Sequence, residues 1–188
     1  MIKGLFIGAL ALVANTAAFA QPVAVLVPAQ SEIGFVSTQM GAPVEGHFGK
    51  FDAQIALDPK HPEAGRVAIE IDTASAALGV PLTDAELPKP NWFASAAFPR
   101  ASFQSSAIKG SGDGRFEVAG TLTVKGHAQP LVVPVQLTQS AGTSIARGSF
   151  TVKRLAFHIG DAEWADTSLV ADDVQVRFKL TLTGLPPL

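Results

Sequence analysis

The sequence predicts an all-β domain, an antiparallel sandwich or barrel of about eight or nine strands. Apolar and polar residues alternate with a period of two in many short segments, most clearly in 115–124. Turn signals rich in glycine or proline separate these segments along the chain. Only one stretch, 74–95, interrupts the pattern for long, so little helix is expected.

The first twenty residues have the pattern of a cleaved signal peptide. Lys3 supplies a positive charge, residues 5–13 are apolar, and Ala18-Phe19-Ala20 forms a small-x-small cleavage site. The apolar run is about half of the roughly 20 residues that a membrane-spanning helix needs. We therefore expect cleavage after Ala20, a single mature domain over residues 21–188, and a location in the periplasm.

Composition excludes several classes of protein. The chain has no cysteine, which rules out lipoprotein acylation, disulfides and thiol chemistry. Its formal net charge is −2 and its lysines and arginines do not cluster, so nucleic acid is not an expected partner.

The first half of the domain is expected to form strands over 22–27, 32–40, 43–57 and 66–73. The third of these changes phase at Gly49, because apolar residues occupy even positions before it and odd positions after it. A glycine at a phase change predicts a β-bulge that bends one strand around a curved sheet.

The stretch 74–95 contains three prolines, Pro81, Pro88 and Pro90, which prevent a long regular element. Only residues 82–87 have the pattern of a helical turn or two. A loop of this length in a compact domain is usually functional or a lid. We expect it to cover one end of the sheet.

The second half begins with a three-stranded meander. Its strands are expected to end at Ile108, to span 115–124, and to span 131–138, with turns at 109–114 and 125–127. Two more strands, 144–154 and 173–183, flank an irregular stretch at 155–168. Full closure of the sheet into a barrel would leave no edge strand exposed.

Several segments in order make the chain resemble the YceI-like family of exported lipocalin-like barrels. They are Gly46-His47-Phe48-Gly49-Lys50-Phe51-Asp52, Asp58-Pro59, 67–72 with Ser75, Phe98-Pro99-Arg100-Ala101-Ser102-Phe103, 116–126, 154–160 and 174–180. The resemblance implies an antiparallel, up-and-down, lipocalin-like barrel of about eight strands with one short helical segment in the 74–95 loop.

The same resemblance implies a long apolar interior that holds a polyisoprenoid chain, in some relatives a quinone tail or a prenyl pyrophosphate. Asn91 stands where many relatives carry an acidic residue, and Ala156 and His158 also depart from the family pattern, which bears on the headgroup. The segments 92–93 and 163–166 look like a branch found in bacteria that encode small membrane cytochromes. A transient contact with a membrane or with such a cytochrome is the partner that this implies.

An apolar ligand needs only a lining, because each buried methylene contributes roughly 0.8 kcal/mol. The alternative is that the same aromatic residues fill a dry core. Gly120, Ala146 and Gly148, which are small and share the inward phase, favour a cavity. The expected lining is Phe35, Phe48, Trp92, Phe93, Phe98, Phe103, Phe116, Val118, Leu122, Phe150, Val152, Phe178 and Leu180.

Three further residues are candidates for contact with a polar headgroup: Arg154, His158 and Trp164. Arg154 continues an inward strand phase, and a guanidinium there is suited to a pyrophosphate or a quinone oxygen. The alternative for Arg154 is a salt bridge at the rim with Asp161, Glu163 or Asp166. The alternative for His158 is an ordinary surface position.

The sequence therefore favours a periplasmic carrier for an isoprenoid or similar lipid, a binding protein rather than an enzyme, with no cofactor beyond a bound polyisoprenoid or quinone-like lipid. The histidines lack metal-ligand spacing, and no serine lies in a nucleophile elbow. A lipid-modifying enzyme that uses Arg154 and His158 is one alternative. An outer-membrane barrel is another, although only Trp92 and Trp164 could form its aromatic girdles. Either a monomer or a homodimer fits this reading.

Overall fold

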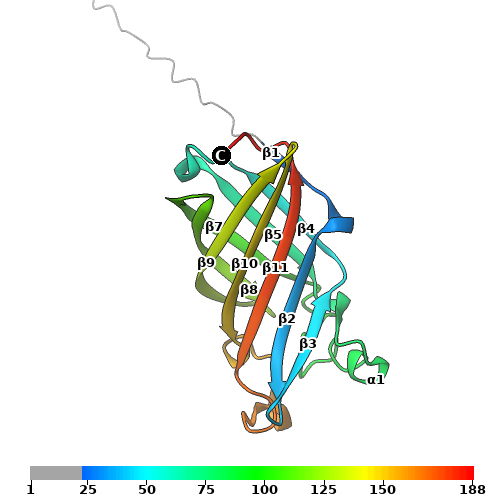
Figure 1. The fold of residues 1–188 in the computed structure, drawn as a ribbon. Coiled ribbons are helices and arrows are strands. Elements are labelled where there is room, and N and C mark those ends of the chain that lie inside the picture. The colour runs from blue at the N-terminus through cyan, green and yellow to red at the C-terminus, as the bar shows by residue number, and fades with distance from the viewer. Residues whose placement is uncertain (1–22) are drawn as a thin grey trace, which may run out of the picture.

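The computed structural model describes residues 23–188, so the predicted signal peptide and its cleavage site lie outside the described part. Eight antiparallel strands close into a barrel (Figure 1). The barrel closes where β1 pairs with both β4 and β11. In order around the barrel, the strands are β1 (Val23–Leu26), β4 (Phe51–Ala56), β5 (Arg66–Asp72), β7 (Arg100–Gly112), β8 (Arg115–Val124), β9 (His127–Ser140), β10 (Thr143–Lys153) and β11 (Asp173–Thr183).

Three further strands extend the wall toward the lower end of Figure 1. They are β2 (Glu32–Gln39), which pairs with β11, β3 (Ala42–Phe48), which pairs with β2, and β6 (Ala76–Ala77), which pairs with the end of β3. The short 3-10 helix η1 (Pro28–Gln30) separates β1 from β2. The wall is therefore longer on this side than the eight-stranded ring alone.

The predicted phase change at Gly49 falls at a break between two strands. β3 ends at Phe48 and β4 begins at Phe51, and Gly49 donates its backbone N–H to the carbonyl of Ser75 at 3.0 Å. The chain bends here from the lower wall into the ring, which gives the change of phase its structural cause. The bend is a two-residue interruption rather than the expected bulge.

The expected helical segment of the 74–95 loop is α1 (Pro81–Asp84). It begins one residue earlier than expected because proline fits the first position of a helix, where its missing N–H is not needed. The 3-10 helix η3 (Thr73–Ser75) precedes the loop. The fully buried Thr73 hydroxyl anchors the end of the loop, since it lies 3.0 Å from Ser95 Oγ and 2.8 Å from the carbonyl oxygen of Phe98.

The turn expected over 109–114 is shorter than predicted. Strand β7 continues to Gly112, which pairs with Arg115, and register shifts along the β7–β8 ladder accommodate the extra residues. Only Asp113 and Gly114 remain in the turn, with φ values of 53° and 71°. Positive φ at both central residues is the geometry that two-residue hairpins favour.

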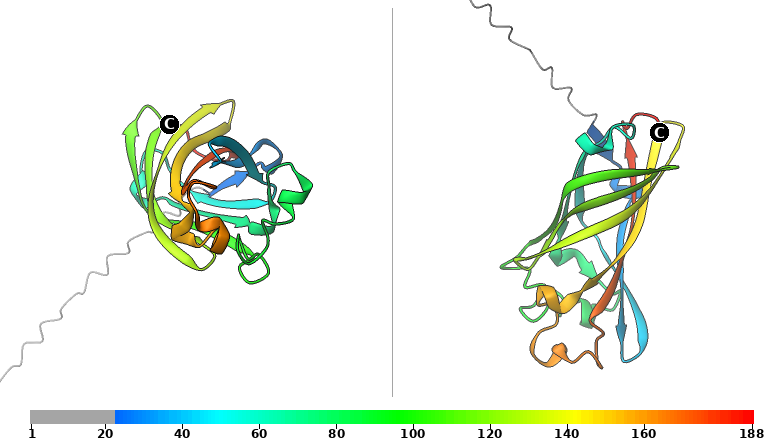
Figure 2. Two further views of the ribbon diagram at one scale, coloured as in Figure 1. Left: turned by 90° about the horizontal axis from the view of Figure 1, so that it is seen from below. Right: turned by 90° about the vertical axis from the view of Figure 1, so that its left-hand side faces the viewer.

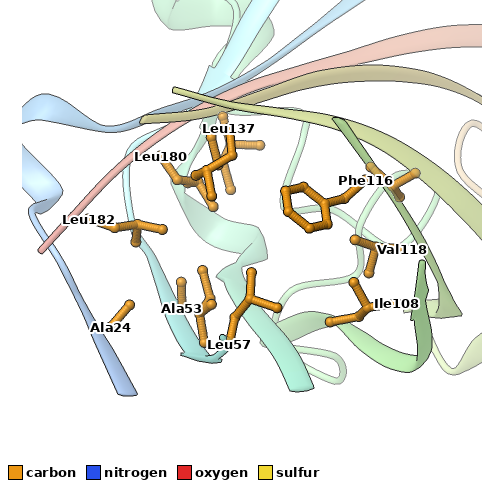
Figure 3. Packing of buried hydrophobic residues seen from close by; sticks show 13 residues of the cluster. Ala24, Ala53, Leu57, Ile108, Phe116, Val118, Leu137, Leu180 and Leu182 are labelled. Atoms are coloured by element: carbon orange, nitrogen blue, oxygen red, sulfur yellow. The ribbon is translucent and has the colours of Figure 1, made fainter. Parts of the chain in front are cut away.

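The apolar phase of the strands faces the interior. Along β8, Phe116 and Val118 are buried, whereas Glu117 between them and Thr121 further along are exposed. Figure 3 shows Phe116, Leu180 and Ala53 pointing inward from different strands. Charged residues such as Arg147 and Arg177 occupy the outer face. No helix within residues 23–188 is long and apolar enough to span a membrane.

The second irregular stretch lies across the lower end of the barrel (orange in Figure 2). It consists of η4 (Arg154–Phe157), η5 (Ala162–Ala165) and the connections that lead into β11. Its residue Leu169 accepts a hydrogen bond from the backbone N–H of Met40 at 2.8 Å, and Val170 bridges to Gln39. The segment 155–172 is thus attached to the turn between β2 and β3.

Candidate functional site

The barrel interior contains two apolar cavities. The upper chamber, whose lining reaches Leu182 and Leu185 near the C-terminus, has a volume of about 130 Å³. Ser102 is the polar side chain in its lining, and the rest of the lining is apolar. The lining comes from strands all around the ring: Ile33, Ile55, Leu57, Val67, Ile69, Ile71, Phe103, Ile108, Phe116, Val118, Leu122, Val133, Val135, Leu137, Ala146, Phe150, Val176, Phe178, Leu180 and Leu182, with Leu185 of the C-terminal tail.

The lower chamber has a volume of about 360 Å³ and lies between the barrel wall, the α1 loop and the segment 155–172. Its apolar lining includes Phe35, Phe48, Leu78, Leu87, Trp92, Phe93, Val152, Phe157 and Ile159. Polar lining residues are Ser37, Gln39, Thr83, Glu86 and Arg154. Leu82 and Trp164 also line it and are 85% and 36% exposed, so the chamber opens to solvent beside these two residues.

Pairs of phenylalanine and glycine help to keep the interior hollow. A Cβ at Gly148 would lie 2.5 Å from Cζ of Phe178, its direct partner on β11. A Cβ at Gly46 would lie 2.3 Å from Cζ of Phe35, its direct partner on β2. Each ring therefore lies over the wall space beside its glycine, as in other sheets where aromatic rings cover glycines.

The same arrangement occurs on a third pair of strands. A Cβ at Gly120 of β8 would lie 2.6 Å from Cζ of Phe103 on β7. Rings that lie back against glycines project less into the lumen than rings that stand over larger neighbours. The small residues that favoured a cavity in the sequence, Gly120 and Gly148, are two of the three glycines in these pairs.

The structure places most residues of the expected lining on one or both chambers. Phe103, Phe116, Val118, Phe178 and Leu180 line the upper chamber, Phe35, Phe48, Trp92, Phe93 and Val152 line the lower one, and Leu122 and Phe150 line both. Many of these side chains are only partly buried although they point inward, because they face an empty space. Whether each contacts a ligand stays a prediction.

Phe98 was expected in this lining, and the structure places it outside both chambers. It is 38% exposed and lies in the turn before β7, with its ring against Gly126. The expectation was wrong because Phe98 precedes Arg100, the first residue of β7, so the strand phase of Phe103 does not extend to it. The phase of β7 that faces inward is that of Ala101 and Phe103.

Other lining residues were not singled out from the sequence. The aliphatic residues Ile55, Ile69 and Ile71 share the inward phase of their strands, so alternation was a sufficient signal for them. Leu87 and Phe157 lie in irregular segments, where no periodic pattern indicates which side chains point inward.

Arg154 is 2% exposed and uses all of its N–H groups within the protein. Its Nε donates to the carbonyl of Ala171 (3.1 Å), its Nη1 to those of Ile159 (2.8 Å) and Gly160 (2.9 Å), and its Nη2 to those of Trp164 and Val170 (both 2.6 Å). Burial lowers the pKa of Arg154 below its ordinary value, and the charges of Asp172 and Asp161 oppose this. The guanidinium holds the segment 155–172 in place.

Neither of the two expectations for Arg154, a contact with a ligand headgroup or a salt bridge at the rim, matches this geometry. No N–H is left for a headgroup, and within residues 23–188 no carboxylate forms a salt bridge with it. The strand phase ends at Lys153, and Arg154 begins η4, so its side chain turns beneath the loop that follows. The charge on Arg154 therefore organises the floor of the lower chamber.

His158 lies on the outer surface, as its alternative interpretation had it. Its ring stacks on His127 with the centroids 4.4 Å apart, and its Nδ1 lies 3.4 Å from Asp161 Oδ2. Lys125 donates from Nζ to the carbonyl of His158 at 2.5 Å, which ties the segment to the β8–β9 turn. In the described part of the chain, no three histidine or acidic side chains come together as a metal site.

Trp164, the third headgroup candidate, lies at the opening of the lower chamber beside Trp92. Asn91, the neighbour of Trp92, accepts hydrogen bonds at its carbonyl from the N–H groups of Gly160 (2.8 Å) and Asp161 (3.0 Å). The α1 loop and the segment 155–172 are therefore joined at this opening by backbone bonds and by an aromatic contact.

Comparison with known proteins gives one family. A family model described as a YceI-like domain matches residues 25–182. Among curated relatives, a UPF0312 protein of Vibrio cholerae is 28% identical over 106 residues, which are 56% of each chain. A UPF0312 protein of Yersinia pestis is 34% identical over 93 residues, 50% of this chain and 48% of that one. The chain thus spans about half the length of the curated relatives it matches.

Solved structures share the fold. BcnA of Burkholderia cenocepacia superposes with a TM-score of 0.81 and 40% identity, covering 84% of this chain and 99% of that one. A YceI protein of Campylobacter jejuni has a TM-score of 0.69 at 20% identity, with 74% and 84% of the two chains covered. A polyisoprenoid binding domain from Saccharophagus degradans has a TM-score of 0.69 at 16% identity, with 88% and 99% covered. The last two are similar in fold alone.

Proposed function

The chain belongs to the YceI-like family, and from this premise we propose that it is a periplasmic carrier that holds a long apolar isoprenoid, of polyprenyl or quinone type, or a similar lipid inside its barrel. The observation that carries the proposal is the hollow interior, two apolar chambers of about 130 and 360 Å³ within one wall. The wider chamber opens to solvent, so a ligand has a route into the barrel.

The free energy of such binding comes from burial of apolar surface rather than from polar contacts. Burial of one methylene contributes roughly 0.8 kcal/mol, so a five-carbon isoprene unit contributes on the order of 3 kcal/mol before ordering costs. Three or four buried units therefore suffice for about micromolar affinity. This agrees with a site whose lining is mostly apolar.

The family and the polyisoprenoid binding domain of Saccharophagus degradans support a binding protein rather than an enzyme. For the head end of the ligand, we propose Trp164 as a contact at the opening of the lower chamber. Arg154 is proposed to act through the segment 155–172 that it holds. His158, on the outer surface, would meet a ligand only outside the chamber.

Two tryptophan substitutions on one strand test the proposal. Val152 lines the lower chamber, while the adjacent Thr151 is exposed on the outer face of β10. We expect wild-type protein purified from its native host to release an isoprenoid or similar lipid on organic extraction, detected by mass spectrometry. Val152→Trp should lose most of this lipid and Thr151→Trp should keep it.

The result that overturns the proposal is equally direct. Native protein that releases no lipid and binds no added isoprenoid, or equal lipid content in the Val152→Trp and Thr151→Trp variants, would exclude the barrel interior as the site. Circular dichroism of both variants establishes that a loss reflects a filled chamber and not a loss of fold.

The periplasmic location is part of the proposal and is supported by the pattern of the first twenty residues. Cell fractionation should recover the protein in the periplasmic fraction, and its N-terminal sequence should begin at Gln21. Recovery in the cytoplasm with residues 1–20 intact would contradict this location and leave the binding function untouched.

A further inference from the structure

Four side chains line both chambers: Ile71, Leu122, Phe150 and Val176. They come from β5, β8, β10 and β11, which are spread around the ring of eight strands. In the order of the ring, β5 lies opposite β10. The four side chains therefore surround the lumen at the level where the two chambers meet, and we call them the waist.

The waist is anchored in the most regular part of the wall. Phe150 and Val176 are direct partners in the β10–β11 ladder, Leu122 is the partner of Phe103, and Ile71 is the partner of Ala101. None of the four lies in a loop. The width of the waist is therefore set by side-chain rotamers and not by loop movement.

The chambers on the two sides of the waist differ in chemistry. Glu86, Gln39 and Arg154 line the lower chamber, which also has the solvent opening beside Leu82 and Trp164. In the upper chamber Ser102 is the polar lining residue and no lining side chain is charged. A polar head is therefore unfavourable in the upper chamber, because its lost hydrogen bonds with water would not be replaced.

We propose that the waist admits the apolar tail of a ligand from the lower into the upper chamber, and that its four side chains thereby determine the tail length that the protein recognises. This deepens the proposed function and rests on it. The ligand class is a molecule with a flexible apolar tail longer than the lower chamber. Short tails stay below the waist and gain nothing from the upper chamber.

The test measures affinity for isoprenoid alcohols of increasing length: farnesol, geranylgeraniol and solanesol. In the wild-type protein, each further unit that passes the waist should tighten binding by about tenfold after ordering costs. Phe150→Trp narrows the waist. In this variant the gain in affinity from farnesol to geranylgeraniol and solanesol should be lost, whatever the change in affinity for farnesol itself.

The matched control is Ser149→Trp, which places the same side chain next in sequence but on the outer face of β10. Ser149→Trp should keep the full gain in affinity with tail length. Val176→Phe narrows the waist from β11 and provides a second variant should Phe150→Trp not fold. It too should lose the gain in affinity with tail length.

Three outcomes would refute the proposal. A wild-type protein that binds all three alcohols equally tightly refutes the waist and leaves the proposed function standing. A folded waist variant that keeps the gain with length also refutes it. If none of the three alcohols binds to wild type, both the waist and the isoprenoid proposal fail.

Discussion

The indole rings of Trp92 and Trp164 lie 5.7 Å apart, centroid to centroid, with an angle of 44° between their planes. Trp92 follows α1 and Trp164 belongs to η5, so their contact joins the two irregular segments that cover the lower chamber. They are the two tryptophans of the chain. Every change at the opening of this chamber should therefore appear in the intrinsic fluorescence.

The first prediction uses this reporter. Addition of geranylgeraniol should change the tryptophan emission, and bound ligand should reduce quenching by acrylamide, because the ligand replaces solvent beside both rings. Trp92→Phe should keep a ligand-dependent signal from Trp164. An unchanged emission in protein that mass spectrometry shows to be loaded would place the ligand away from this opening.

The second prediction concerns Arg154. Arg154→Met leaves carbonyl groups beneath the segment 155–172 without donors, so the free energy of unfolding should fall by about 2–4 kcal/mol. Arg154→Lys should recover less than half of this, because an ammonium cannot reach five carbonyls in a planar fork. Chemical denaturation measures the loss.

Hydrogen exchange in the Arg154 variants locates the effect. Faster exchange is expected in the backbone around Ile159, Gly160 and Val170, with β8 and β9 unchanged. Uniformly faster exchange throughout the barrel would mean that Arg154 supports the whole fold and not the floor of the lower chamber.

The third prediction concerns Gly46. The atoms nearest to the new Cβ of Gly46→Ala belong to side chains, Phe35 at 2.3 Å and Leu78 at 2.8 Å, so Phe35 should move into the lower chamber. We expect a loss of about 1–2 kcal/mol in stability and about tenfold in lipid affinity. Adding Phe35→Leu should restore both the stability and the lipid affinity. A double-mutant cycle measures this coupling between the two positions.

Gly148 provides the contrast to Gly46. A Cβ at Gly148 would lie 2.3 Å from the backbone carbonyl oxygen of Pro134 as well as near Phe178. Because backbone cannot rotate away as a side chain does, Gly148→Ala should destabilise the protein more, and Phe178→Leu should not rescue it. Equal rescue at both positions would contradict this reading of the two glycines.

The fourth prediction concerns the anchor of the α1 loop. Thr73→Val keeps the shape of the side chain but removes the hydroxyl between Ser95 and the carbonyl of Phe98. The free energy of unfolding should fall by about 1–3 kcal/mol, because polar groups are left unpaired in a buried place. A change below about 0.5 kcal/mol would show that water reaches these groups.

The fifth prediction concerns the pKa of Asp166. A hydrogen bond from the Ser168 hydroxyl, and then one from the Ser168 backbone N–H, lowers this pKa below its ordinary value. Since the folded pKa lies below the unfolded one, the stabilisation is present above the unfolded pKa and is lost as the pH falls through the folded pKa. Ser168→Ala should raise the pKa of Asp166 in an NMR titration, and an unchanged value would refute the hydroxyl as its main cause.

Much of the fold follows from local alternation. The ranges of β8 and β11 agree with the strands expected from the sequence, and the break at Gly49 lies where the phase changes. Inward alternation also places Phe116, Val118 and Leu180 on the upper chamber. These features depend on which face of a strand a residue occupies, and a period of two determines that directly.

The sequence predicted less about the irregular segments. The position of Phe98 was misread because parity has no meaning in the turn before β7. The role of Arg154 was misread for a related reason, since the strand phase stops one residue before it. Its five carbonyl partners lie in a loop whose path no periodic pattern describes.

The sequence by itself determined antiparallel strands with an apolar inner face, because alternation and turn residues act over a few neighbouring positions, and its resemblance to the YceI-like family indicated that they close into a barrel. Only the tertiary structure decided that this interior is two chambers joined at a waist, and that Arg154 holds a loop. The division arises where Ile71, Leu122, Phe150 and Val176 meet across the lumen, and such meetings depend on strand order and stagger, which link residues far apart in the chain.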